Sequence, residues 1–143
     1  MLKISIGCDH RGYEVKKNVI EKYKDKFEFI DCGTNSLDST DYPIYANRVC
    51  KKILDKESDF GILICSSGIG ISIAANRHKG IRAALCFNDT MARLTRLHNN
   101  SNILCFGADI VGISVIYEMI DVFFTAQFLG DDKYQKRNDM IDE

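Results

Sequence analysis

The sequence predicts an α/β fold in which a five-stranded parallel sheet is covered by helices on both faces. Short apolar runs typical of strands alternate five times with stretches of helical period. This alternation is typical of parallel sheets, because the crossover helices pack on the two faces of the sheet. A chain of 143 residues with 45% hydrophobic content can bury one core. We therefore predict a single domain over residues 1–143.

Each predicted strand is followed by a predicted helix. Strands are expected at 2–6, 27–31, 60–64, 81–86 and 103–106, and helices at 11–24, 42–56, 68–78, 89–98 and 112–128. Asp41 and Pro43 suit the cap and first turn of the second helix, and residues 88–90 offer capping groups to the fourth. The polar tail over 130–143 is expected to be a frayed end or an arm that packs on a partner.

Charge and cysteine pattern exclude several classes of protein. A net charge of −1 gives no broad attraction to nucleic acid or to anionic lipid. The first residues lack the features of a secretory signal, and charged residues interrupt the apolar stretches, so we expect a cytoplasmic protein without a membrane span. The six widely spaced cysteines include no C-x-x-C pair, which predicts free thiols and no metal site.

The most informative segment is 60–76, where an apolar strand leads through Cys65 into a small-residue turn that opens a helix. Backbone N–H groups at a helix start lack partners within the helix, and together with the helix dipole they favour negative charge. Glycines allow the backbone to approach a ligand closely. We therefore predict a reactive thiol beside a cradle for an oxyanion, although a buried thiol at a strand end is the simpler alternative.

Other polar residues are expected at the same edge of the sheet as Cys65. Ligands of open parallel sheets bind beyond the carboxyl ends of the strands, where the strand order reverses. Asp9 and His10 follow the first predicted strand, and Tyr42 lies just before the second helix. A carboxylate, an imidazole and a thiol around an anion cradle predict a site for acid–base chemistry.

Three familiar motifs do not fit the turn after Cys65. A P-loop requires a lysine that the turn lacks, and the fingerprint G-x-G-x-x-G that begins at Gly68 ends in Ile73. A cysteine phosphatase loop requires an arginine six residues after the cysteine, where Ile71 stands. The nucleotide-binding and phosphatase interpretations therefore lose their main support.

Several further motifs stand in order along nearly the whole chain. They are Gly7-Cys-Asp-His-Arg-Gly12, Asp41-Tyr-Pro43, Cys65-Ser-Ser-Gly-Ile-Gly70 continuing to Ala74-Ala-Asn-Arg77, Gly80-Ile-Arg-Ala83, and Arg96-Leu-His-Asn99 followed by Asn102-Ile-Leu104. As an ordered set they resemble the ribose-5-phosphate isomerase B family. The resemblance implies a Rossmann-like three-layer α/β/α sandwich that works without a cofactor, as a homodimer or a dimer of dimers.

The resemblance also implies a reaction, the interconversion of ribose 5-phosphate and ribulose 5-phosphate through an enediolate in the pentose phosphate pathway. Cys65 is then the base that moves the proton, Asp9 and Ser67 assist at the ring oxygen and hydroxyl groups, and His98 aids ring opening. The backbone of the turn is expected to stabilise the enediolate through Ser66, Ser67, Gly68, Ile69 and Gly70, with Tyr42 nearby.

His98 lies at the far end of the predicted fourth helix, away from the edge that carries Cys65. One subunit is therefore not expected to bring the two residues together. The resemblance implies that the site lies between subunits, with His98 and Asn99 reaching the pocket of the partner.

The residues expected to bind the phosphate group depart from the family pattern. Relatives carry two arginines in the tail, where this chain has Lys133 and Arg137. They often carry arginine where Asp109 stands, and usually glycine where Ser66 stands. Either His10 joins the two tail residues in binding the phosphate, or a nearby arginine compensates: Arg77, Arg93 or Arg96.

Other functions stay open at this point. Family members act on galactose 6-phosphate, allose 6-phosphate or other sugar phosphates, and a non-catalytic subunit that only binds them would keep the same fold. A phosphocarrier domain phosphorylated on cysteine also uses a thiol on a small-residue loop, but its cysteine normally follows the first strand and Cys65 follows the third.

Overall fold

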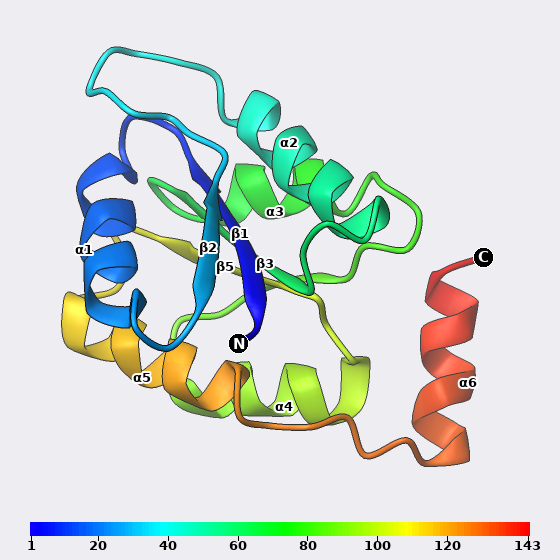
Figure 1. Cartoon of the computed structure of the whole chain (residues 1–143). Helices are drawn as coiled ribbons and strands as arrows, with labels where there is room; N and C mark the ends of the chain where they lie inside the picture. The colour runs from blue at the N-terminus through cyan, green and yellow to red at the C-terminus, as the bar shows by residue number, and fades with distance from the viewer.

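Five parallel strands form the centre of the computed structural model, which describes residues 1–143 (Figure 1). They are β1 (Lys3–Cys8), β2 (Glu28–Asp31), β3 (Phe60–Cys65), β4 (Ala83–Leu85) and β5 (Ile103–Gly107). Their order across the sheet is β2-β1-β3-β5-β4. The chain therefore builds the sheet in one direction from β1 and then in the other, and the order reverses between β1 and β3. This position is where the fold predicts a ligand site.

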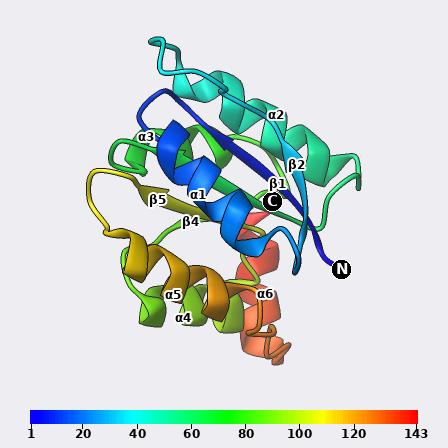
Figure 2. The same ribbon diagram turned by 60° about the vertical axis from the view of Figure 1, so that its left-hand side comes forward.

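Helices cover both faces of the sheet, which confirms the predicted fold class. One face carries α1 (Tyr13–Tyr23), α4 (Asp89–Asn99) and α5 (Ile113–Phe123), and the other carries α2 (Tyr42–Leu54) and α3 (Ile69–Ala75). Figure 2 shows α2 and α3 on one side of the sheet and α4 and α5 on the other. Several elements are shorter than predicted: β4 has three residues, α3 has seven, and α5 ends at Phe123.

The alternating side chains of β3 divide the core into two parts. Ile62 and Ile64 pack in a cluster with residues of α1, α4 and α5, whereas Leu63 and Cys65 pack with residues of α2 and α3. This alternation follows from the two-residue period of a strand whose two faces are both buried. Because Cys65 continues the pattern, its side chain lies on the face of α2 and α3.

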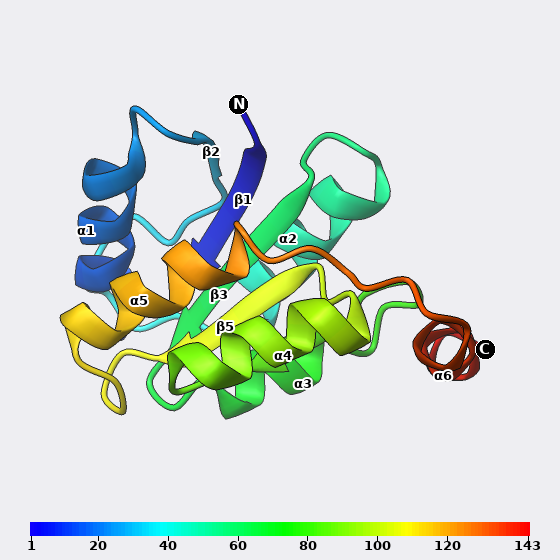
Figure 3. The same ribbon diagram turned by 90° about the horizontal axis from the view of Figure 1, so that it is seen from below.

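The polar tail is not frayed, because it forms a sixth helix, α6 (Asp132–Ile141). Asn138 Nδ2 donates a hydrogen bond to the His98 carbonyl oxygen at 3.1 Å, and Arg82 Nη1 lies 2.6 Å from Asp142 Oδ2. Figure 3 shows α6 at the opposite end of the molecule from α1. None of the helices has both the length and the apolar character required to cross a bilayer.

Candidate active site

The loops after β1 and β3 meet at the carboxyl edge of the sheet. Cys8 pairs with Ile64 in the parallel ladder, and the Asp9 N–H donates to the Ile64 carbonyl oxygen at 3.3 Å. Asp9 and His10 therefore leave β1 directly beside the point where Cys65 ends β3. The topology thus places a carboxylate, an imidazole and a thiol at the strand-order reversal.

The turn after Cys65 holds the sulfur atom in place. Cys65 is 5% exposed, and its Sγ accepts a hydrogen bond from the Gly68 N–H at 3.2 Å. The turn requires glycine at position 68, because its φ is +80° and a Cβ there would lie 2.7 Å from the Phe106 backbone carbon. The Ala108 N–H donates to the Cys65 carbonyl oxygen at 2.9 Å and joins the turn to β5.

The same turn offers backbone donors to a ligand. The N–H groups of Gly68 and Ile69 are used inside the turn, by Cys65 Sγ and by Ser67 Oγ at 3.1 Å. The N–H groups of Ser66, Ser67 and Gly70 have no hydrogen-bond partner in the protein. Within the 66–70 backbone predicted to form the cradle, the donors that remain free for a ligand are therefore these three groups. Because α3 has only seven residues, these local donors rather than a long helix dipole define the cradle.

Tyr42 closes one side of this cradle. A Cβ on Gly70 would lie 2.5 Å from Tyr42 Cζ and 2.7 Å from its hydroxyl oxygen. The tyrosine ring therefore packs directly against the first turn of α3, which explains why residue 70 has no side chain. The ring is 38% exposed, so it also faces the opening of the site.

Hydrogen bonds orient the side chains of the loop after β1. Asp9 is 6% exposed, and its Oδ1 accepts from the Arg11 N–H at 3.0 Å. His10 Nδ1 accepts from the Thr40 N–H at 3.2 Å, which leaves the ring proton on Nε2 in the neutral imidazole. His10 thereby joins its loop to the segment that leads into α2.

Two residues that depart from the family pattern contact each other in the structure. Ser66 Oγ donates to Asp109 Oδ2 at 2.6 Å, and the Asp109 N–H donates to the Ser66 carbonyl oxygen at 3.0 Å. Arg11 Nε lies 3.9 Å from the same Asp109 oxygen. Sequence reasoning missed Arg11, although it belongs to the motif that contains Asp9 and His10. Its position directly after His10 was the available signal.

Four predicted site residues lie away from Cys65, near the amino edge of the sheet. The strands are parallel, so α4 starts at the carboxyl edge after β4 and ends near the start of β5. His98 and Asn99 occupy that end of α4. The His98 ring stacks on the Tyr134 ring of α6, with centroids 4.5 Å apart and planes at 16°. The other two residues, Lys133 and Arg137, stand exposed on α6. One protomer therefore does not assemble the full predicted site.

The three arginines considered as alternative phosphate ligands, Arg77, Arg93 and Arg96, lie in different surroundings. Arg96 is excluded, because its guanidinium group packs against the rings of Phe60 and Phe123 and its Nη1 donates to the Ser101 carbonyl oxygen at 2.6 Å. Burial in this apolar setting lowers the pKa of Arg96. Arg93 is exposed on α4.

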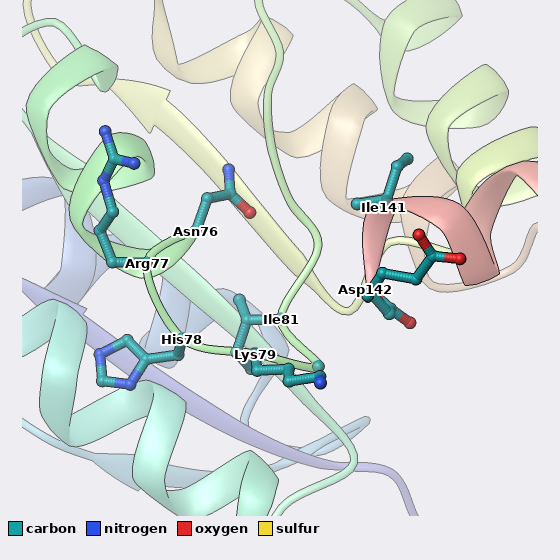
Figure 4. A pocket seen from close by; sticks show the side chains of 9 residues that line it. Asn76, Arg77, His78, Lys79, Ile81, Ile141 and Asp142 are labelled. Atoms are coloured by element: carbon teal, nitrogen blue, oxygen red, sulfur yellow. The ribbon is translucent and has the colours of Figure 1, made fainter.

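Arg77 lines a cavity of about 290 Å³ at the amino edge. Figure 4 shows Arg77, His78 and Lys79 on one side of this cavity and Asp142 on the other. A second cavity of about 290 Å³ lies between β4, α4 and the end of α6. Neither cavity contains Cys65, and no group of three or more His, Cys, Asp or Glu side chains is arranged to hold a metal ion.

Comparison with known proteins gives one consistent family. The Ribose/Galactose Isomerase family matches residues 4–141. The chain is 42% identical to ribose-5-phosphate isomerase B of Escherichia coli (strain K12), covering 99% of this chain and 95% of that protein. The ribose 5-phosphate isomerase of Thermotoga maritima has a TM-score of 0.96 and 45% identity, covering 99% of this chain and 97% of that one.

A third relative was solved with a ligand. Ribose-5-phosphate isomerase B of Mycoplasma genitalium, with bound ribulose-5-phosphate, has a TM-score of 0.92 and 39% identity, and the match covers 98% of this chain and 93% of that one. These matches span the loops that carry Asp9 and Cys65 as well as the end of α4 and α6. The chain therefore belongs to the ribose/galactose isomerase family.

Proposed function

We propose that the protein interconverts ribose 5-phosphate and ribulose 5-phosphate, and that the proton moves at the turn after β3. The observation that carries this proposal is the Cys65 thiol held beside three unpartnered backbone N–H groups. Aldose–ketose isomerisation requires a base that moves a proton between C1 and C2 and donors that stabilise the enediolate formed in between. The turn and the adjacent Asp9 supply groups of these kinds.

The proposed reaction begins with opening of the furanose ring. Asp9 and Ser67 assist at the ring oxygen and the hydroxyl groups, and His98 aids ring opening. The Cys65 thiolate then removes the proton from C2 of the aldose; the C–H electron pair forms the C1–C2 double bond, and the carbonyl pair moves to O1 to give the enediolate. A proton passes from O2 to O1, the Cys65 thiol returns its proton to C1, and C2 becomes the carbonyl carbon of the ketose. The cysteine thus acts as a proton shuttle and forms no bond to carbon.

The cradle stabilises the charge that develops on oxygen. The N–H groups of Ser66, Ser67 and Gly70 are fixed by the backbone, so they need no rearrangement when the enediolate forms. Loss of one oxyanion donor in other enzymes costs about 3–4 kcal/mol of transition-state stabilisation. We therefore expect the cradle to contribute about as much to the rate as the base.

We further propose that the active form is a homodimer, or a dimer of such dimers, with sites shared between subunits. His98 and Asn99 at the amino edge would then serve the Cys65 of the partner, and Lys133 and Arg137 would bind the phosphate group together with His10. Support comes from the exposed apolar side chains that a second copy would cover. They include Ile69, Ile73 and Phe87, each more than half exposed.

The proposed location is the cytoplasm, in a reducing compartment. All six cysteines are free and buried. Free thiols persist where cellular reductants keep disulfides from forming.

An isomerisation assay tests the proposed function. Ribose 5-phosphate, galactose 6-phosphate and allose 6-phosphate are each incubated with the wild type, with Cys65→Ala and with Cys50→Ala, and ketose formation is followed by NMR. We expect turnover of ribose 5-phosphate by the wild type and Cys50→Ala, and almost none by Cys65→Ala. Cys50 is the matched control because it is a buried thiol in α2, outside the site.

The other outcomes separate the alternatives. Preferred turnover of a hexose phosphate would keep the reaction type and replace the substrate, which the family's galactose-specific members make a real alternative. Unchanged turnover in Cys65→Ala would refute the assigned base. Absence of turnover with every sugar phosphate would overturn the isomerase proposal.

A further inference from the structure

Arg11 stands at the opening of the candidate site, yet the proposed reaction gives it no task. We propose that Arg11 binds the phosphate group of the substrate and that Asp109, held by Ser66, positions its guanidinium group. This inference rests on the proposed function, because the ligand is a sugar phosphate bound at the same site. The phosphate group would then be bound by a residue of the same loop that carries Asp9 and His10.

The backbone of Arg11 is anchored to the site. Its N–H donates to Asp9 Oδ1 at 3.0 Å. The next residue, Gly12, packs so closely on β3 that a Cβ there would lie 2.8 Å from Ile64 Cγ2. The side chain of Arg11 is 61% exposed and therefore extends from a fixed base toward solvent, next to Asp109.

The guanidinium group of Arg11 has free N–H donors for a phosphate group. It makes no hydrogen bond within the protein, and its one ionic contact is the 3.9 Å approach of Nε to Asp109. An exposed pair at such a distance contributes little to stability. By contrast, the guanidinium groups of Arg48, Arg82 and Arg96 all donate to oxygen atoms of the protein.

Asp109 is well placed to steer Arg11, because it is itself fixed. Its carboxylate accepts from Ser66 Oγ at 2.6 Å, and its N–H donates to the Ser66 carbonyl oxygen at 3.0 Å. The carboxylate thus stays beside the turn that holds Cys65. Alone it would repel a phosphate group, but with Arg11 next to it the pair carries no net charge and presents the free edge of a guanidinium.

Arg11 also offers a two-point contact to a phosphate group, which the lysine at position 133 of the tail cannot provide. Lysine at position 133 is a point charge, whereas an arginine binds two phosphate oxygens at once with a planar fork. An open-chain pentose phosphate carries its reacting carbons and its phosphate at opposite ends. Correspondingly, the Cys65 thiol is buried, whereas the Arg11 side chain, which contacts Asp109 beside the same turn, is exposed.

The first test compares Arg11→Gln and Arg11→Lys with Lys17→Gln as a matched control. Lys17 is also exposed, lies on α1 and loses the same charge when substituted. We expect Arg11→Gln to raise KM for ribose 5-phosphate about 10-fold or more, with kcat nearly unchanged, because a hydrogen bond to a charged group is lost in the ground and transition states alike. Arg11→Lys should restore part of the affinity, and Lys17→Gln should behave as the wild type.

A second readout does not require turnover. Binding of inorganic phosphate to the wild-type assembly is measured by 31P NMR titration, and Arg11→Gln should weaken it by a similar factor. If the wild type turns over no sugar phosphate but this difference in phosphate affinity is present, the proposed reaction fails while Arg11 remains an anion-binding residue. Equal KM and equal phosphate affinity in Arg11→Gln and Lys17→Gln would overturn the inference.

The role of Asp109 is tested by a double-mutant cycle with Arg11. In the Arg11→Gln background, Asp109→Asn should lower KM, because it removes a negative charge near the phosphate. In the wild-type background the same substitution should give no such gain, because it also releases the arginine. A gain of equal size in both backgrounds would show that Asp109 does not position Arg11.

Discussion

The two edges of the sheet differ in how their polar groups are used. At the carboxyl edge, the turn after Cys65 leaves the N–H groups of Ser66, Ser67 and Gly70 without partners. At the amino edge, His98 stacks on Tyr134 and its carbonyl oxygen accepts from Asn138. Backbone donors at the first edge are thus free to bind a ligand, whereas at the second edge His98 already contacts residues of α6. A reaction that needs residues from both edges therefore needs two copies of the chain.

The cavities reinforce this difference. Both hollows of about 290 Å³ lie toward the amino edge, and the one in Figure 4 is lined by residues 76–81 and 141–143. The carboxyl edge has no comparable hollow, although its donors and its thiol are chemically better suited to a sugar phosphate. The proposed site therefore rests on unpaired donors beside a fixed thiol and not on empty volume.

The largest expected effect comes from disabling one edge at a time. Cys65→Ala and His98→Gln should each lower kcat by about 10²–10⁴-fold, the usual loss on removing a general acid or base. If sites are shared, dissociating and mixing the two inactive variants should recover activity, because hybrid dimers contain one site with both intact residues. The measurement is the rate of ribose 5-phosphate isomerisation before and after mixing.

A mixture of Cys65→Ala with Cys65→Ala/His98→Gln serves as the control, since no hybrid of these chains contains an intact site. Recovery in this control would point to contaminating activity. Hybrid dimers that stay inactive would show that His98 does not act in the site of the partner.

The position of Cys65 could be predicted because it depends on local signals. An apolar strand that ends in small residues places the thiol at the carboxyl edge, whatever the rest of the chain does. Asp9 and His10 follow from the same reasoning at the end of β1. The alternation of strands and helices likewise predicts the parallel sheet, since it requires no knowledge of distant contacts.

The features that sequence reasoning missed depend on distant contacts. Of the residues in α6 only Asn138 is buried, so its sequence lacks an apolar face, and contacts with His98 and Arg82 hold the helix in place. The contact of Arg11 with Asp109 joins two loops 98 residues apart, and neither loop by itself indicates the other as its partner. Neither arrangement has a signal in a local window.

An ion pair whose lysine is buried should contribute more to the free energy of unfolding than an exposed ion pair. Lys16 is 1% exposed, and its Nζ lies 2.5 Å from Asp31 Oδ1 and 2.8 Å from Asn35 Oδ1, beneath the carboxyl edge. Lys16→Ala should lower the free energy of unfolding by about 2–4 kcal/mol, because it removes a buried side chain and opens a cavity, whereas Asp31, which is 38% exposed, stays in contact with water. Urea denaturation monitored by circular dichroism measures the change.

The matched control is Lys52→Ala, which removes the exposed pair between Lys52 and Glu57. This variant should lose less than about 1 kcal/mol. Equal losses in both variants would mean that the buried lysine does not fix the loop over residues 31–35.

A smaller effect is expected where Tyr42 meets the cradle. Gly70→Ala places a methyl group 2.5 Å from Tyr42 Cζ, so the ring or the turn must shift. We expect a loss of about 1–3 kcal/mol in the free energy of unfolding, as in other overpacked sites. Adding Tyr42→Ala should restore part of this loss, whereas Tyr42→Phe should not, because the ring remains. Additive losses in the double variant Gly70→Ala/Tyr42→Ala would refute the close contact.

The last effect concerns the buried thiol of Cys8 and is absent at neutral pH. Burial raises the pKa of Cys8 to about 12, and the positive charge of Lys16 opposes this shift only in part. In the unfolded chain the pKa of this thiol is near its ordinary value of 9.0. Below that pH both states keep the proton, so stability does not depend on this group. Between pH 9 and about 12 only the unfolded state loses it, so stability falls with rising pH, by about 1.4 kcal/mol per pH unit.

Replacing Cys8 by alanine removes one titrating group, so its contribution to the pH dependence of stability is lost. The slope of unfolding free energy against pH should become shallower above pH 9 by the amount of one group and stay unchanged at neutral pH. Urea denaturation at a series of pH values gives both slopes. An unchanged alkaline slope in Cys8→Ala would mean that the folded state ionises this thiol as readily as the unfolded one. In that case burial on the face of α1 would not keep Cys8 protonated.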